Sequence, residues 1–216
     1  MDPESRLVVS VVPGKRTAAN AEALIADFQR RTGGRMMNLI TTDEYAPYPQ
    51  AILKAYGQCV LPPRTGKRGR PASPHWIAPP ELNYATVHKT REKGRVVKVE
   101  ARVIFGREQA VQAALNASTV SRHVNTSFLE RQNGTDRNRN ARKVRKTYCF
   151  SKDWEVHDAV TYFTMFSYNF CWPVRTLAQR DAAGRLQQRS PAMAAGLTDH
   201  LWPLREWLAF PCIQRE

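Results

Sequence analysis

The segment from Leu82 to Phe105 constrains the fold of this 216-residue chain most. It contains two runs, Leu82–Lys89 and Arg95–Phe105, in which apolar and polar residues alternate. Alternation with a period of two is typical of half-buried β-strands. Between the runs, Glu92-Lys93-Gly94 has the composition of a tight turn. The pattern therefore predicts a β-hairpin.

Upstream of the hairpin, the pattern predicts a strand, a helix and a second strand. Arg6–Val12 is a β-branched run, Thr17 is suited to cap a helix that ends before two glycines, and Met36–Thr41 is a second apolar run. This order predicts a parallel strand pair and the start of an α/β sheet. The second strand carries Asp43 at its carboxyl end, where the functional groups of such sheets lie. The alternative is that Asp43 is only a turn or helix-cap residue.

A break in the pattern follows a short predicted helix over Pro47–Tyr56. The segment Pro62–Pro80 contains six prolines, and its cations are Arg64, Lys67, Arg68 and Arg70. The sequence KRGRP is typical of a thin arm that carries arginine into the minor groove of DNA. The alternative is a mobile basic insertion without such a role.

The most basic stretch is Thr126–Lys152, in which Glu130 precedes a long series of cations. Those cations are Arg131, Arg137, Arg139, Arg142, Lys143, Arg145 and Lys146. Much of the stretch has the composition of a helix. On a helix Glu130, Asn133 and Arg137 share one face, because residues three and four apart are neighbours. A carboxylate in this setting suits a metal ligand or an acid–base group beside a polyanion. The alternative is a solvated basic helix with ordinary ion pairs.

The last third of the chain is predicted to be helical. Trp154–Phe170 is an apolar and aromatic helix that we expect to pack on the sheet, with its aromatic stripe in the core rather than stacked on bases. Ser190 and Pro191 are typical of a helix start, and LWPLREWLAF completes a short helical tail.

A formal net charge of +14 indicates a polyanionic partner, most commonly nucleic acid. An anionic membrane is the rival partner, but the sequence has no apolar run of the roughly 20 residues that a span needs. The start MDPESR has no signal-peptide pattern, so a cytoplasmic location is expected. The four cysteines form no C-x-x-C pair, which argues against a zinc knuckle or a disulfide framework.

Two acids are candidates for metal-dependent phosphodiester chemistry. Such chemistry needs carboxylates that hold two divalent ions about 3.5–4 Å apart. Oxygen ligands of this kind suit Mg²⁺ or Mn²⁺. Asp43 at a strand end and Glu130 on a distant helix could meet over such a site. No phosphate-binding loop, serine–histidine–aspartate order or H-E-x-x-H motif is present.

Four segments carry a family resemblance that covers essentially the whole chain. They are LITTDEYAPYPQAI, SFLERQNGTDRNRNARKVRKTYCFSK, FSYNFCWPVRTL and SPAMAAGLTDHLW. Together they resemble bacterial insertion-sequence transposases of the DDE type, in which a ribonuclease H-like domain holds three acids. The resemblance matches Asp43 to the second acid and Glu130 to the final glutamate. It matches Asn133 and the following arginines and lysines to a helix that lies along the DNA backbone.

The sequence also departs from the family pattern. In the family, the first acid lies on a first strand, and a second strand and a turn D-x-x-[ST]-[RK]-L-V-V follow. Our chain begins at that turn, with Asp2-Pro3-Glu4-Ser5-Arg6. The resemblance then makes Asp2 the turn acid and leaves the first two strands and the first catalytic acid unmatched. A competing alignment makes Asp2 the first acid. Gly134 also departs, because the family has a larger apolar residue at this helix position.

The resemblance implies an α/β fold with a ribonuclease H-like mixed sheet flanked by helices. The hairpin is then an insertion and the first two strands are lacking. Residues 1–170 would be a partial catalytic domain, with a flexible basic loop over residues 61–80, and residues 171–216 a helical tail.

The implied activity is metal-dependent DNA cleavage and strand transfer by a truncated or inactive transposase. Asp43 and Glu130 would hold Mg²⁺ or Mn²⁺, in a two-metal site in an intact relative. The DNA contacts would come from Asn133, Arg137, Arg139, Arg142, Lys143, Arg145 and Lys146, with Arg64, Lys67, Arg68 and Arg70 as an accessory arm. The expected partner is double-stranded DNA in the bacterial nucleoid, with a homo-oligomer on DNA in an intact relative.

Two alternatives stay open. The first is a non-catalytic remnant that binds DNA without sequence preference. The second is a basic RNA-binding protein, although the glycine-and-aromatic signature of the common RNA modules is lacking.

Overall fold

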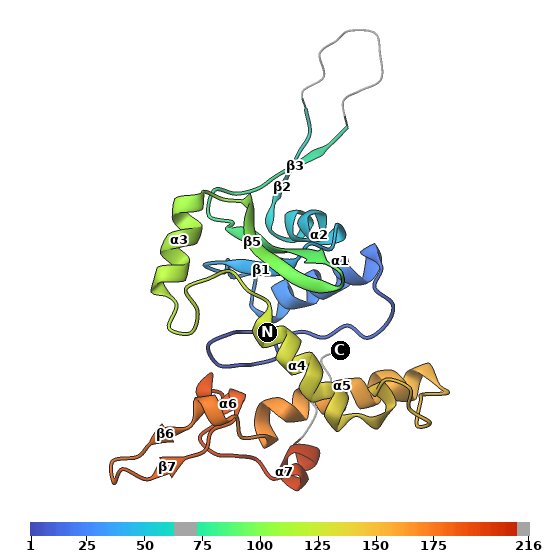
Figure 1. The fold of residues 1–216 in the computed structure, drawn as a ribbon, viewed down its shortest axis with the longest axis vertical. Helices are drawn as coiled ribbons and strands as arrows, with labels where there is room; N and C mark the ends of the chain where they lie inside the picture. The colour runs from blue at the N-terminus through green and yellow to red at the C-terminus, as the bar shows by residue number, and fades with distance from the viewer. Residues whose placement is uncertain (63–72, 211–216) are drawn as a thin grey trace. The chain divides into compact units, whose positions relative to one another are not determined.

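The computed structural model describes residues 1–62 and 73–210, and its chain divides into two compact units (Figure 1). The sheet unit is Gly14–Ser127. The helical unit combines Met1–Pro13 with Phe128–Glu216. The division at residue 170 that the sequence suggested stays a prediction.

The sheet unit is built on a three-stranded mixed sheet with the strand order β1-β4-β5. β1 (Ile40–Asp43) is parallel to β4 (Tyr84–Glu92), with Asp43 opposite Val87. β5 (Arg95–Phe105) is antiparallel to β4 and completes the predicted hairpin. The mixed sheet and its helices confirm the α/β class, and the hairpin is confirmed with its turn at Lys93 and Gly94, both of which have positive φ.

Three helices and a small second sheet complete this unit. The elements are α1 (Ala18–Arg31), α2 (Pro47–Tyr56), α3 (Glu108–Ala117), β2 (Gln58–Val60) and β3 (His75–Ile77), with β2 and β3 antiparallel. Thr17 caps α1 as predicted, since its side chain accepts a hydrogen bond from the Asn20 backbone N–H at 3.2 Å.

Tyr84 and Ala85 divide the core of the sheet unit into two clusters, because successive strand residues point to opposite faces of a sheet. Tyr84 packs with Ile52 and Leu82 in a cluster that α1 and α2 also line. Ala85 packs in the other cluster, which α3 lines. Helices therefore cover both faces of the sheet where β1 lies beside β4.

The prediction of a strand over Arg6–Val12 is wrong, because the side chain of Asn169 forms the hydrogen bonds that a neighbouring strand would otherwise form with Val8. Residues 6–12 form no strand. Instead, the Val8 backbone N–H donates to Asn169 Oδ1 and the Val8 carbonyl accepts from Asn169 Nδ2, both at 2.9 Å. The second predicted strand is displaced, since β1 begins at Ile40, and it pairs with β4 rather than with residues 6–12. The predicted parallel pair is therefore wrong, although Asp43 does end its strand.

The helical unit contains the helical segments and strands that follow residue 126. They are α4 (Ser127–Arg139, whose first residue belongs to the sheet unit), the 3₁₀ turns η1 (Ala141–Lys143) and η2 (Arg175–Leu177), α5 (Trp154–Cys171), the two-residue strands β6 (Gln179–Arg180) and β7 (Leu186–Gln187), and the short helices α6 (Pro191–Ala194) and α7 (Leu204–Ala209). The predicted aromatic helix is confirmed as α5, and α6 and α7 pack on it. Phe163 meets Trp207 with ring centroids 5.2 Å apart, and Phe170 meets Trp202 at 4.8 Å.

The predicted basic helix is shorter than its composition suggests. α4 ends at Arg139, because the Asn140 side chain accepts a hydrogen bond from the Arg142 backbone N–H and starts a 3₁₀ turn. Lys146 has a φ of 59°, which is incompatible with a helix. Arg142 therefore lies in the 3₁₀ turn η1, and Arg145 and Lys146 lie in the loop after it, rather than on the helix that the resemblance implied. Among the described residues, no helix has both the length and the apolar character to cross a bilayer.

Candidate functional site

Asp43 lies at the carboxyl end of β1 and is bound to a cation of its own unit. Arg16 Nη2 donates to Asp43 Oδ2 at 2.6 Å, although both side chains are more than half exposed. The Arg16 guanidinium also lies over the Tyr45 ring, with Cζ 4.3 Å from the ring centroid, and the Tyr45 hydroxyl donates to the Arg16 carbonyl at 2.8 Å. These interactions together hold the guanidinium against the carboxylate.

Two phenols line the apolar side of Asp43. Burial raises the pKa of Tyr84, whose hydroxyl lies 2.7 Å from Thr42 Oγ1. Burial also raises the pKa of Tyr48, and the negative charge of Asp43 raises it further. Both phenols are therefore neutral at physiological pH. The carboxylate of Asp43 lies between a neutral interior and a solvent-exposed cation.

A second charged group next to Asp43 was missed by sequence reasoning. Glu44 Oε2 lies 2.5 Å from His88 Nδ1, and Arg102 Nη1 donates to Glu44 Oε1 at 3.0 Å. The parallel register that places Asp43 opposite Val87 also brings Glu44 beside His88. The sequence signal existed only in the pairing of β1 with β4, because Glu44 and His88 are 44 residues apart.

On α4, the structure confirms the shared face that the spacing predicted. Glu130, Asn133 and Arg137 are all exposed, and Gln132 and Asp136 on the other side are buried. The exposed face therefore presents a carboxylate, an amide and a guanidinium to solvent. No apolar side chain of α4 is buried among the described residues, so polar contacts hold the helix in place.

Asp136 is the anchor of this arrangement. Lys143 Nζ lies 2.7 Å from Asp136 Oδ2, and Thr164 Oγ1 of α5 donates to Asp136 Oδ1 at 3.0 Å. The side chains of Asp136 and Lys143 are only 6% and 17% exposed. This pair ties the loop after α4 back onto the helix. The ammonium of Lys143 therefore has a structural partner within its own unit.

Arg139 is also held inside the helical unit. Its Cζ lies 3.5 Å from the centroid of the Trp172 ring and 5.4 Å from that of Tyr168. Burial lowers the pKa of Arg139, and burial raises the pKa of Tyr168 against the opposing effect of Arg139 and Arg6. Arg6 stacks on Phe128 at 3.6 Å. Arg139 therefore contributes packing in the described structure.

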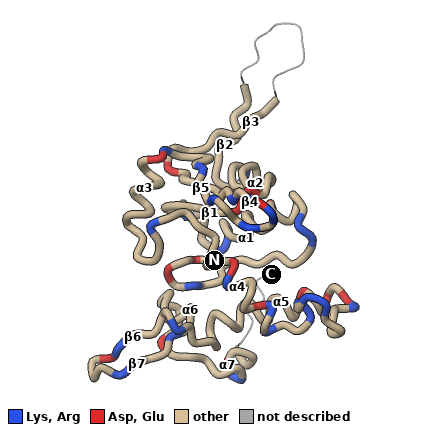
Figure 2. Tube along the Cα trace, viewed as in Figure 1, with Lys and Arg blue, Asp and Glu red and all other residues tan. Residues whose placement is uncertain are grey.

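The remaining predicted cations of this region are exposed. In Figure 2, blue segments recur along the trace between α4 and α5. Among the predicted DNA contacts, Arg137 on α4 and Arg142, Arg145 and Lys146 after it are exposed. The proposed accessory arm, Arg64, Lys67, Arg68 and Arg70, lies outside the described residues.

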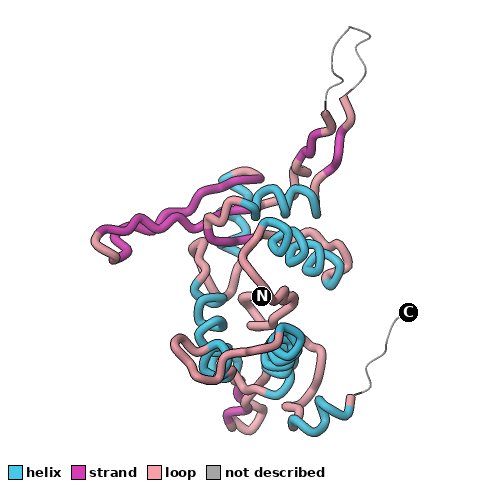
Figure 3. Tube along the Cα trace, turned by 90° about the vertical axis from the view of Figure 1, so that its right-hand side faces the viewer, coloured by secondary structure: helices cyan, strands magenta, loops and turns pink. Residues whose placement is uncertain are grey.

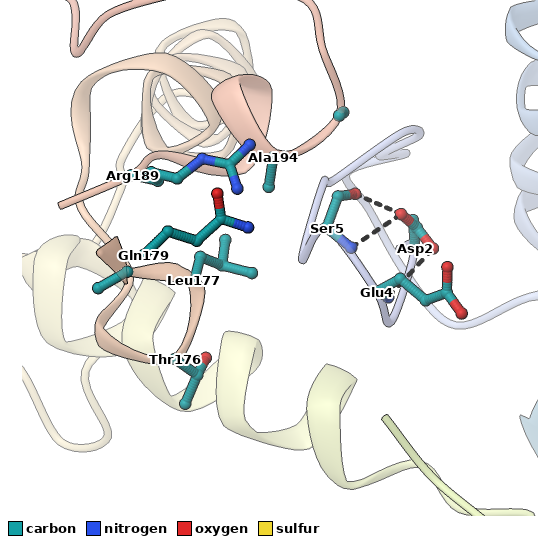
Figure 4. A pocket seen from close by; sticks show the side chains of 10 residues that line it. Asp2, Glu4, Ser5, Thr176, Leu177, Gln179, Arg189 and Ala194 are labelled. Atoms are coloured by element: carbon teal, nitrogen blue, oxygen red, sulfur yellow. Dashed lines mark hydrogen bonds between the residues drawn. The ribbon is translucent and has the colours of Figure 1, made fainter. Parts of the chain in front are cut away.

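Asp2 closes a turn, as the turn interpretation of the resemblance predicts. Its Oδ2 accepts from the Ser5 backbone N–H at 3.0 Å and from the Ser5 hydroxyl, and its Oδ1 accepts from the Glu4 N–H at 3.2 Å (Figure 4). This turn forms one wall of a hollow of about 370 Å³. The opposite wall in Figure 4 carries Gln179 and Arg189. The Asp2 carboxylate is directed at its own turn.

The two predicted metal ligands belong to different units, Asp43 to the sheet unit and Glu130 to the helical unit. Their convergence stays a prediction. Within residues 1–62 and 73–210, no group of three or more histidine, cysteine, aspartate or glutamate side chains is arranged to hold a metal ion. Comparisons with protein-family models, with curated proteins and with solved structures find no match for this chain.

Proposed function

We propose that the chain binds double-stranded DNA and is a remnant of a DDE transposase catalytic domain with a ribonuclease H-like fold. The observation that carries the proposal is the set of exposed cations on and after α4. Arg137, Arg142, Arg145 and Lys146 face solvent, and the buried pair of Asp136 and Lys143 fixes the loop that bears three of them. Cations on an ordered loop lose less conformational entropy on binding than cations on a disordered segment.

The physical basis of binding is the neutralisation of phosphates. Each lysine or arginine that contacts a phosphate releases condensed counterions, which makes the affinity fall steeply with salt. A net charge of +14 adds long-range attraction to any polyanion. Contacts of this kind position a protein on DNA and carry no sequence information. We therefore expect binding with little sequence preference, in keeping with a nucleoid-associated protein.

The family resemblance adds a metal-dependent activity to the proposal. Asp43 and Glu130 are exposed carboxylates, whose oxygen donors suit Mg²⁺ or Mn²⁺. When bound, such ions would neutralise the attacking and leaving oxygens of a phosphodiester. Asp43 would hold the metal through the oxygen that now faces Arg16. Asp43 and Glu130 match two of the three acids of the family, and we expect little or no strand transfer from these two acids alone.

The second candidate is a DNA-binding protein without catalysis, and the ion pair of Arg16 with Asp43 favours it. A guanidinium 2.6 Å from Oδ2 competes with a metal ion for the same carboxylate. Both candidates share the DNA-binding surface. They differ in whether a metal ion displaces Arg16 from the carboxylate of Asp43.

The first experiment measures affinity for a duplex of arbitrary sequence by fluorescence anisotropy across a salt series. A variant that combines Arg142→Ala, Arg145→Ala and Lys146→Ala should bind more weakly, with a salt slope smaller by roughly 0.9 for each phosphate that the protein no longer neutralises. The matched control combines Arg175→Ala, Arg180→Ala and Arg205→Ala. It removes three exposed cations from the same unit at other positions. Equal reductions of affinity in both variants would contradict a localised surface.

The second experiment separates the two candidates by the nicking of supercoiled plasmid in Mg²⁺ or Mn²⁺. If the chain retains catalysis, Asp43→Ala and Glu130→Ala should abolish nicking and leave DNA affinity unchanged or slightly tighter. If the chain only binds, no nicking above that of the variants should occur. Efficient metal-dependent joining of DNA ends by the unaltered chain would refute the expectation of an impaired enzyme.

A further inference from the structure

β5 is a long edge strand with an open side. It pairs with β4 along its inner edge, and no strand pairs with its outer edge in the part of the chain that the structure describes. The strand has 11 residues, about twice the length of an average strand. An edge of this length presents a row of backbone donors and acceptors to any complementary strand.

The part of β5 nearest the hairpin turn is also apolar and exposed. Val96, Val97 and Val99 are 43%, 52% and 56% exposed. Figure 3 shows the hairpin extending away from the helices of its own unit as a two-stranded ribbon. Two strands alone are marginally stable in water, and further strands are needed to cover an apolar face. A partner strand would bury these valines and continue the sheet.

The charges of β5 identify that partner. Lys98 and Glu100 flank Val99, and their side chains lie on the same face of the strand, with Lys98 Nζ 2.8 Å from Glu100 Oε1. We propose that β5 pairs antiparallel with β5 of a second copy of this chain, about a two-fold axis at Val99. In this register Lys98 of each copy faces Glu100 of the other and Val99 faces Val99, within the part of β5 that pairs regularly with β4 from Lys98 to Val103. Opposite charges and apolar pairs directly across two strands each stabilise a sheet.

The neighbouring symmetric registers are less favourable. An axis at Glu100 places two glutamates opposite each other and Lys98 opposite Arg102, and like charges in these positions are destabilising. An axis at Ala101 would pair Val99 with Val103, which already packs in the core of the sheet unit. A lysine on an edge strand normally discourages pairing, but here each lysine meets an acid of the other copy.

The test uses the full chain without DNA and measures its mass by sedimentation over a range of concentrations. The unaltered chain should reach twice its monomer mass of 24.6 kDa. Lys98→Glu and Glu100→Lys should each remain monomeric, because each variant places like charges opposite each other in its own dimer. An equimolar mixture of the two variants should recover the dimer, because each then meets the opposite charges of the other. This recovery shows that both variants are folded.

Cross-linking tests the register in a background with Cys59→Ser and Cys149→Ser, which removes two exposed thiols. Val99→Cys should form a disulfide-linked dimer under mild oxidation, and Ala101→Cys should not. An unaltered chain that stays monomeric at every concentration overturns the proposal. So does a dimer that survives Lys98→Glu, because its interface must lie elsewhere. Cross-linking through Ala101→Cys alone overturns the axis at Val99.

Discussion

Arg16 Nη2 and Asp43 Oδ2 lie 2.6 Å apart at the carboxyl end of β1. The guanidinium is further held by the face of Tyr45. A cation therefore already occupies the carboxylate that the family resemblance matches to a metal ligand. A metal ion that binds through this oxygen has to displace Arg16.

Replacing Arg16 should make Asp43 a better metal ligand. An exposed ion pair contributes about 0.2–1 kcal/mol, so Arg16→Ala should increase the affinity for Mn²⁺ by no more than about fivefold. Titration of Mn²⁺ followed by electron paramagnetic resonance measures the change. Lys54→Ala is the matched control, since it opens another exposed ion pair, with Glu22, in the same unit. Arg16→Ala combined with Asp43→Ala should lose the gain.

Asp136→Asn should destabilise the helical unit strongly. The change leaves the ammonium of Lys143, which is only 17% exposed, without its carboxylate. Breaking a buried pair by removing one partner costs about 3–5 kcal/mol, and partial exposure places this pair at the lower end. Urea unfolding followed by circular dichroism gives the loss. The control Asp181→Asn opens an i,i+4 pair with the exposed Arg185 and should cost less than about 1 kcal/mol.

Asn169→Leu should release the amino-terminal segment from α5. The leucine removes both hydrogen bonds to Val8 and leaves a buried N–H and a buried carbonyl unpaired, at about 1–3 kcal/mol each. Hydrogen exchange at the Val8 amide should accelerate together with the loss of stability. Asn169→Asp keeps the acceptor for the N–H and should protect that amide better. Slow hydrogen exchange at the Val8 amide in the leucine variant would show that Asn169 does not protect this amide.

His200 should titrate above its ordinary value of about 6.5. Hydrogen bonds that the protonated ring donates to Asp199 first and to Glu206 second raise the pKa of His200, whose Nε2 lies 3.0 Å from Glu206 Oε1 on α7. A raised pKa in the folded state means that the contribution to stability is full below about pH 6.5. It is lost as the pH rises through the higher folded value.

Nuclear magnetic resonance titration of the His200 ring checks this shift. Glu206→Gln should move the midpoint down, and Asp199→Asn should move it down further. An unchanged midpoint in both variants would show that neither carboxylate acts on the ring.

The features that the sequence predicted correctly rest on local signals. The hairpin follows from the alternation of apolar and polar residues and a turn with glycine, and α5 follows from an apolar run that Asp153 caps. The shared face of Glu130, Asn133 and Arg137 follows from helical geometry alone. In each case the residues that decide the structure lie within a few positions of one another.

Two of the features that the sequence missed depend on partners far away in the chain, and the third is local. Residues 6–12 have the composition of a strand, but Asn169 satisfies the backbone of Val8 across 161 positions. The group of Glu44, His88 and Arg102 exists only because β1 pairs with β4 and β4 with β5. The end of α4 at Arg139 was missed because one side chain, Asn140, outweighs the helical preference of the lysines and arginines that follow.

The buried side of α4 is polar, and this determines how the helix can be oriented. A helix held by apolar packing tolerates small rotations, because dispersion contacts are weakly directional. α4 is held by a carboxylate that must meet both Lys143 and Thr164. Turning the helix by a single residue step would rotate Asp136 by about 100° about the helix axis. Asp136, Lys143 and Thr164 would then lose their interactions with one another. The direction in which Glu130, Asn133 and Arg137 face about the helix axis is thereby fixed.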